Sequence, residues 1–154
     1  MSKADFWAQL DADRQRLLQA IAGLSDEEMT AAPAVGEWSV QDILGHVAAW
    51  EWEAVKAVEQ TVAGQRPQLL DIPDFDAWNA AQVAAWRERT LDEVLAELHR
   101  SRQALVEAIN PLDEKQFETL GAFPQIGNTS LRRLLEWKHD RGHAADLEAW
   151  RVGH

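Results

Sequence analysis

Cysteine is absent from this chain of 154 residues. Without thiols the protein forms neither a disulfide framework nor a thiolate metal site. Any metal ion must therefore be bound by imidazole, carboxylate or water. The sequence also lacks a basic segment followed by an apolar stretch near its start, and it has no apolar run long enough to span a bilayer. We therefore expect a cytoplasmic protein with no membrane partner.

Basic residues are scarce relative to acidic ones. The chain has 15 Lys and Arg against 26 Asp and Glu, which gives a formal net charge of −11. The electrostatic field of this negative charge repels phosphate groups, and no Lys- or Arg-rich run offsets it locally. We therefore expect no nucleic-acid partner. With 46% apolar and 27% charged residues, the composition is that of a globular protein. The length suits a single domain over residues 1–154.

Tyrosine is also absent, whereas tryptophan occurs eight times. Buried indoles fill the cores of small proteins, and this is the simplest interpretation for most of the eight. Some of them instead suit the wall of a pocket for an apolar ligand. We name Trp50, Trp137 and Trp150 as pocket-lining candidates.

Apolar residues recur at helical spacing along most of the chain, and no segment shows the alternation of a strand. The spacing predicts long helices over residues 6–21 and 39–62 and a last helix that starts at Ser130. Residues 75–109 fit either one bent helix or two. The sequence therefore predicts an all-α fold.

Capping patterns mark where several helices begin. Ser25 with Glu28 and Thr90 with Glu93 match the capping box. In this motif the side chain of each residue accepts a hydrogen bond from the backbone amide of the other. A short acidic turn and a loop with Gly and Pro follow the first long helix, and the same order recurs from Pro111. Each half of the chain thus contains a helix, a short acidic turn, a loop and a second helix. Two such halves predict a four-helix bundle with short extra helices in the connections.

The last predicted helix carries two histidines four residues apart, His139 and His143. Such a pair projects from one helix face and suits neighbouring positions on a metal ion, but it equally fits a polar helix edge with solvated histidines. A third histidine, His46, lies at the edge of the apolar stripe of the second helix, where a ligand facing a cleft would lie. Gly142 lowers helix stability, so we expect a packing reason such as a closely approaching neighbouring helix.

Carboxylates near these histidines in the sequence are candidates for catalytic residues. Glu53, Glu136 and Asp140 are the candidate catalytic residues, because a carboxylate can orient an imidazole ligand or act as a general base. The alternative for each is a solvated helix face in an acidic chain. His99, which lies among arginines, and the terminal His154 are expected at the surface.

Two segments resemble the DinB-like (DinB/YfiT) superfamily: residues 36–47, GEWSVQDILGHV, and residues 139–147, HDRGHAADL. The similarity spans essentially the whole chain. It implies a four-helix bundle that binds a divalent metal through one histidine of the second helix and an H-x-x-x-H pair of the last. Carried over by position, the ligands are His46, His139 and His143. The resemblance also points toward the ClbS/DfsB branch.

Three imidazoles leave at least one coordination position open, as in catalytic metal sites, and nitrogen ligands suit Zn, Ni, Fe or Co. The resemblance implies a hydrolase or a thiol S-transferase that acts on a small-molecule substrate. In the transferase case a low-molecular-weight thiol such as bacillithiol or mycothiol is the second cofactor. The loop Gly121–Asn128 is expected to border the pocket.

Two other functions fit the same residues. One is a self-protection protein that binds a reactive small molecule without turnover. The other is a stress-linked structural protein whose histidines are relics. The resemblance also implies a homodimer.

Overall fold

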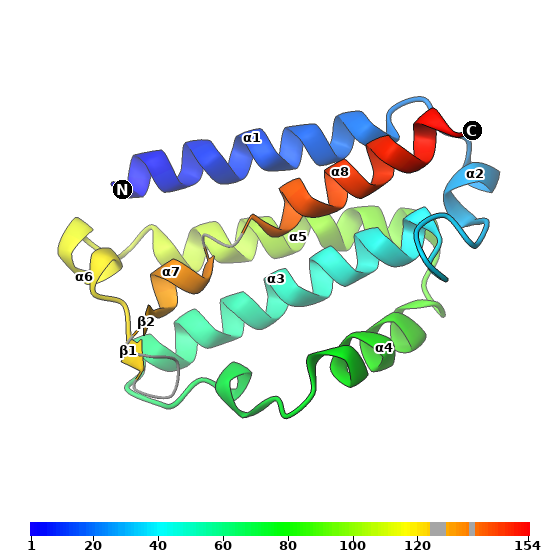
Figure 1. The fold of residues 1–154 in the computed structure, drawn as a ribbon. Coiled ribbons are helices and arrows are strands. Elements are labelled where there is room, and N and C mark those ends of the chain that lie inside the picture. Colours follow the sequence, from blue (N-terminus) through cyan, green and yellow to red (C-terminus); the bar gives the residue numbers. More distant parts are fainter. Residues whose placement is uncertain (124–128, 136–137) are drawn as a thin grey trace.

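The computed structural model describes residues 1–123, 129–135 and 138–154 (Figure 1). The elements follow in chain order as α1 Lys3–Ile21, α2 Asp26–Thr30, α3 Val40–Val62, η1 Gln68–Asp71, α4 Phe75–Trp86, α5 Leu91–Ile109, α6 Glu114–Glu118, β1 Ala122–Phe123, β2 Thr129–Ser130, α7 Leu131–Leu135 and α8 His139–Val152. The short strands β1 and β2 pair antiparallel. The predicted all-α class is confirmed.

Four long helices form the bundle. Helix α3 packs along α5, and α1 packs along α8, while α3 also contacts α8 (Figure 1). Helix α4 lies outside the bundle against α3. The predicted four-helix bundle with short helices in its connections is therefore confirmed. Within the described ranges, no helix is both long enough and apolar enough to cross a membrane.

Residues 75–109 form two helices. Helix α4 ends at Trp86, and α5 begins at Leu91 with Thr90 as its N-cap. The Thr90 hydroxyl accepts a hydrogen bond from the backbone amide of Glu93, and the Glu93 carboxylate accepts one from the backbone amide of Thr90. In a continuous helix these backbone amides would donate to carbonyl groups of the preceding turn. Here the capping box satisfies them instead, so a new helix begins.

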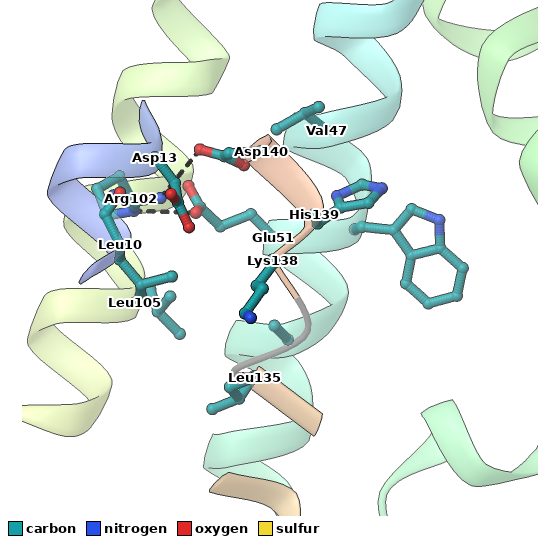
Figure 2. A pocket seen from close by; sticks show the side chains of 12 residues that line it. Leu10, Asp13, Val47, Glu51, Arg102, Leu105, Leu135, Lys138, His139 and Asp140 are labelled. Atoms are coloured by element: carbon teal, nitrogen blue, oxygen red, sulfur yellow. Dashed lines mark hydrogen bonds and ion pairs between the residues drawn. The ribbon is translucent and has the colours of Figure 1, made fainter. Parts of the chain in front are cut away.

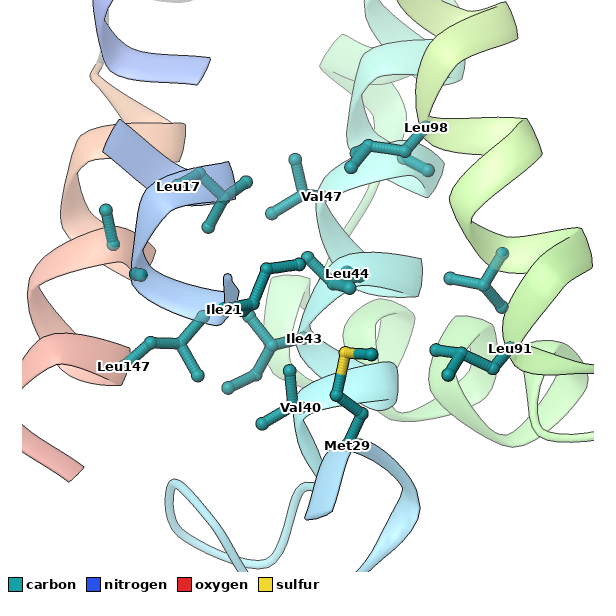
Figure 3. Close-up of a cluster of buried hydrophobic side chains, with 14 residues drawn as sticks. Leu17, Ile21, Met29, Val40, Ile43, Leu44, Val47, Leu91, Leu98 and Leu147 are labelled. Carbon is teal, nitrogen blue, oxygen red and sulfur yellow. The ribbon is translucent and has the colours of Figure 1, made fainter. Parts of the chain in front are cut away.

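Two apolar clusters hold the bundle together. The first joins α1, α3, α5 and α8 around Leu17, Ile43 and Leu44, which are 0% exposed (Figure 3). The second lies around Phe6 and Phe117 toward the other end. Burying one such side chain contributes about 1.5–3 kcal/mol. Residues 49–51 of α3 lie between the part of that helix in the first cluster and the part in the second.

The predicted continuous last helix is wrong. Helix α7 ends at Leu135, and α8 begins only at His139, after Lys138 with the left-handed backbone angles φ 58° and ψ 36°. A right-handed helix does not continue through a left-handed residue. As a result Leu131 and Leu135 of α7 pack in the second cluster, whereas Ala144 and Leu147 of α8 pack in the first.

Candidate metal centre

The structure brings His46, His139 and His143 together. His46 comes from the second turn of α3 and is 5% exposed, while the other two lie one turn apart at the start of α8. Nε2 of His139 lies 3.0 Å from Nε2 of His46 and 3.0 Å from Nε2 of His143. Ring nitrogens of all three lie within 4.8 Å of one another. The cluster joins two helices that are far apart in the sequence.

The start of α8 after Lys138 sets the position of His139 and His143. Since α8 starts at His139, the two histidines occupy its first two turns, and α8 contacts α3. His46 lies deeper than its predicted position at the edge of the stripe, and the Trp38 ring packs against it with centroids 4.9 Å apart. The site is therefore enclosed on the α3 side.

Burial keeps these imidazoles neutral. Loss of solvent, followed by the nearby rings of His139 and His143, lowers the pKa of His46 to about 3. Loss of solvent, then His143 and Arg14, lowers the pKa of His139 to about 3. Burial also lowers the pKa of His143, although Asp146 and Asp140 act in the opposite direction. Neutral imidazoles present the free lone pairs that metal binding requires.

The contacts among the rings fit a bound cation better than hydrogen bonds. One ring nitrogen carries either one hydrogen or one lone pair, so Nε2 of His139 satisfies one neighbour but not both. Two nitrogens bound to one tetrahedral zinc ion lie about 3.3 Å apart, which is close to the observed 3.0 Å. Within the described residues, the buried Nδ1 atoms of His46 and His143 have no hydrogen-bond partner.

A small cavity of about 50 Å³ adjoins the cluster at His139 (Figure 2). Its walls include the side chains of Trp50, Glu51, Arg102 and Asp140, and leucines from α1, α5 and α7 close the opposite side. This volume holds a few water molecules or one small functional group. The cavity lies between the two apolar clusters.

Comparison with known proteins identifies the family. A family model described as the DinB superfamily matches residues 9–146. The chain belongs to the DinB superfamily. The resemblance in the sequence is thereby confirmed, while a place near the ClbS/DfsB branch stays a prediction.

Two similar proteins carry no assigned activity in their names. The chain is 24% identical over 139 residues to the uncharacterized protein YuaE of Bacillus subtilis (strain 168), covering 83% of this chain and 86% of YuaE. It is also similar to the crystal structure of an uncharacterised protein from Escherichia coli UTI89, with a TM-score of 0.80 and 17% identity. That match covers 99% of this chain and 94% of the other, and at this identity it supports the fold alone.

In this DinB superfamily protein the main residue missed by the sequence analysis is Glu51. Its carboxylate is largely buried beside the cavity and accepts hydrogen bonds from Arg14, Arg102 and Ser101. The sequence held a signal for it, because Glu51 lies four residues after Val47 and three before Ala54, inside the apolar stripe. A carboxylate in the middle of such a stripe predicts a buried ionic partner.

The two candidate carboxylates that the structure describes, Glu53 and Asp140, lie in different places in the DinB fold. Asp140 is buried, lines the cavity and accepts a hydrogen bond from Arg14 at 2.6 Å. Glu53 lies in a groove between α3 and α4, where it pairs with Lys56 at 3.1 Å. Glu136 lies outside the described residues. Of the two described, the structure brings Asp140 to the histidines.

Two of the three tryptophans named as pocket-lining, Trp50 and Trp150, lie in different places. Trp50 lines the cavity beside His139, and its Nε1 donates to Oδ1 of Asn79 at 2.7 Å. Trp150 packs against the first apolar cluster near the end of α8. Trp137 and residues 124–128 of the predicted loop lie outside the described residues.

The expected packing reason for Gly142 is wrong. Gly142 is exposed, and among the described residues a Cβ built on it meets no atom of a neighbouring element within 4 Å. Within the described residues, no neighbour therefore requires the lack of a side chain at this position.

Proposed function

We propose that this DinB superfamily protein is a divalent-metal-dependent enzyme that acts on a small molecule, as a hydrolase or a thiol S-transferase. One observation carries the proposal: three neutral imidazoles, one buried and two half-buried, converge so that Nε2 of His139 lies 3.0 Å from Nε2 of each of the other two. His46, His139 and His143 would bind the ion. When bound, a Zn, Ni, Fe or Co ion in such a site supplies Lewis acidity that lowers the pKa of a water or a thiol.

The surrounding residues suit this chemistry. The guanidinium groups of Arg14 and Arg102 neutralise the carboxylates of Glu51 and Asp140, so the centre has no large excess charge of its own. Trp50 and the leucines limit the access of water to the cavity. Asp140 would hold the first turn of α8 in place, since its Oδ2 atom is engaged by both arginines.

The cavity is too small to enclose a whole small-molecule ligand. Sites that enclose a whole small-molecule ligand measure about 300–1,000 Å³. The cavity at His139 measures about 50 Å³, enough for the reacting group of a substrate. A protein that protects the cell by enclosing a reactive molecule would need a larger space at this position.

The first experiment measures metal content. The protein as purified should contain about one equivalent of a divalent metal by elemental analysis, and His139→Ala should abolish stoichiometric binding. His99→Ala is the matched control, because His99 is an exposed histidine on α5 and should leave the metal content unchanged. Equal metal content in all three proteins would contradict the assignment of the site.

A second experiment separates the two reaction classes. The metal-loaded protein is incubated with an activated aryl halide and a low-molecular-weight thiol, and separately with an activated ester in water. Thiol-dependent loss of halide that disappears in His139→Ala supports the S-transferase, whereas ester cleavage without thiol supports the hydrolase. Neither activity above the His139→Ala background would count against an enzyme of these classes.

A further inference from the structure

One buried guanidinium links the histidine-bearing helices. Arg14 of α1 is 7% exposed, and its Nε donates to Oδ2 of Asp140 on α8 at 2.6 Å. Its Nη2 donates to the carboxylate of Glu51 on α3 at 3.1 Å, and its Nη1 donates to the carbonyl oxygen of Leu98 on α5 at 3.0 Å. A single side chain of α1 therefore contacts the other three helices of the bundle.

Two partners of Arg14 lie on the same helices as the candidate ligands. Asp140 directly follows His139, and Glu51 lies five residues after His46, about 7.5 Å further along α3. Arg102 of α5 repeats the link, since its Nε donates to Glu51 at 3.0 Å and its Nη2 to Asp140 at 3.4 Å (Figure 2). Two arginines thus bridge the same two carboxylates.

The first turn of α8 depends on such links. It begins after the left-handed Lys138, and no side chain among the described residues caps its N-terminus. The two residues after His139 are both tied to α1, Asp140 through Arg14 and Arg141 through Asp13 at 2.8 Å. These ion pairs fix the turn that carries His139.

The energetics point to a geometric role. Two buried and two largely buried charges cost desolvation energy that their mutual attraction barely offsets, so apolar side chains of the same volume would stabilise the fold at least as well. The network instead constrains the relative geometry of the helices, because each hydrogen bond fixes an angle and a distance. The fixed quantity here is the position of α8 relative to α3.

We infer that Arg14 is a positioning residue for the metal centre: by clamping Asp140 and Glu51 it sets the distance between His139 and His46. The inference rests on the proposed metal-binding function. Supporting residues around metal ligands typically change metal affinity by about 10–100-fold when they are substituted. We expect an effect of this size, together with a changed coordination geometry.

The test uses a charge-balanced variant of the full chain. Arg14→Met combined with Glu51→Gln removes one charge of each sign and leaves Arg102 paired with Asp140, so no buried charge loses its partner. The matched control is Arg16→Met combined with Glu148→Gln, which removes an exposed ion pair between the same helices α1 and α8. A second control, Val58→Ala, weakens the second apolar cluster without touching the network.

Two measurements are made on each protein. Zinc affinity is determined by competition with a chelator, and the visible absorption of the Co(II)-loaded protein reports the geometry of the ligands. The Arg14/Glu51 variant should keep its helical circular dichroism but bind zinc about 10–100-fold more weakly, with a shifted Co(II) spectrum. Both controls should retain wild-type affinity and spectrum, even where Val58→Ala lowers the melting temperature.

The outcomes separate the two proposals. If the wild-type protein binds no stoichiometric metal, the proposed function fails and the role of Arg14 fails with it. If the wild type binds metal and the Arg14/Glu51 variant matches it in affinity and spectrum, only the positioning role is refuted. An equal loss of affinity in Val58→Ala would also refute it, since general destabilisation would then explain the effect.

Discussion

The metal-free protein should lose stability as the pH falls from 7 to 5. Burial and the neighbouring rings lower the pKa of both His46 and His139 to about 3 in the folded state. In the unfolded chain these side chains have a pKa of about 6.5. Below pH 6.5 the unfolded chain therefore binds protons that the folded chain excludes, and the free energy of unfolding falls with pH between about 6.5 and 3.

The size of this loss follows from the two pKa values. At pH 5 the unfolded imidazole is 1.5 pH units below its pKa of about 6.5, which at about 1.4 kcal/mol per unit gives about 2 kcal/mol per histidine. Two histidines give about 4 kcal/mol, a large part of the 5–15 kcal/mol that stabilises a typical domain. Burial lowers the pKa of His143 as well, which acts in the same direction.

Urea unfolding in the presence of a chelator measures the effect. The wild type should lose about 4 kcal/mol between pH 7 and pH 5, and His46→Leu should lose only about half as much because one of the two imidazoles is gone. His99→Gln, at an exposed position, is the control and should behave as the wild type. A loss below about 1 kcal/mol in the wild type, or the same loss in His46→Leu, would refute the reasoning.

Two further predictions concern the fold. Gly142→Ala should raise the free energy of unfolding by about 1 kcal/mol, because the glycine is exposed on α8 with free space around it, whereas Gly45→Ala should bring no such gain, since its Cβ would lie 3.3 Å from the Trp86 ring. Phe117→Ala should cost about 3–5 kcal/mol, because this ring is 0% exposed and packs against Phe6 at 5.0 Å between centroids. Thermal or urea unfolding checks both, and a stabilised Gly45→Ala or an unaffected Phe117→Ala would contradict the packing described.

Local sequence patterns predicted the helices well where side chain and backbone interact within one turn. The capping boxes at Ser25 and Thr90 are present as expected, because their partners lie three residues away. The prediction failed at Lys138, whose left-handed backbone interrupts a run with continuous helical periodicity. A non-glycine residue rarely adopts that conformation, so nothing in the pattern signals it.

The candidate site was predicted in part. The two histidines of α8 share a face by spacing alone, but spacing does not say which helix that face meets. The family resemblance supplied His46 as the third member, and the structure places the three together. Glu51 was missed because its partners, Arg14 and Arg102, lie 37 and 51 residues away in the sequence.

The amino-acid sequence by itself determined the all-α class and the type of ligand. Helical periodicity and caps act over a few residues, and the absence of cysteine leaves imidazole and carboxylate as the protein's donors for any metal. The tertiary structure decided which polar groups meet. The hydrogen bond from Arg14 to Asp140 joins residues 126 positions apart. Such a contact depends on how α1, α3 and α8 pack, and packing is set by the whole core.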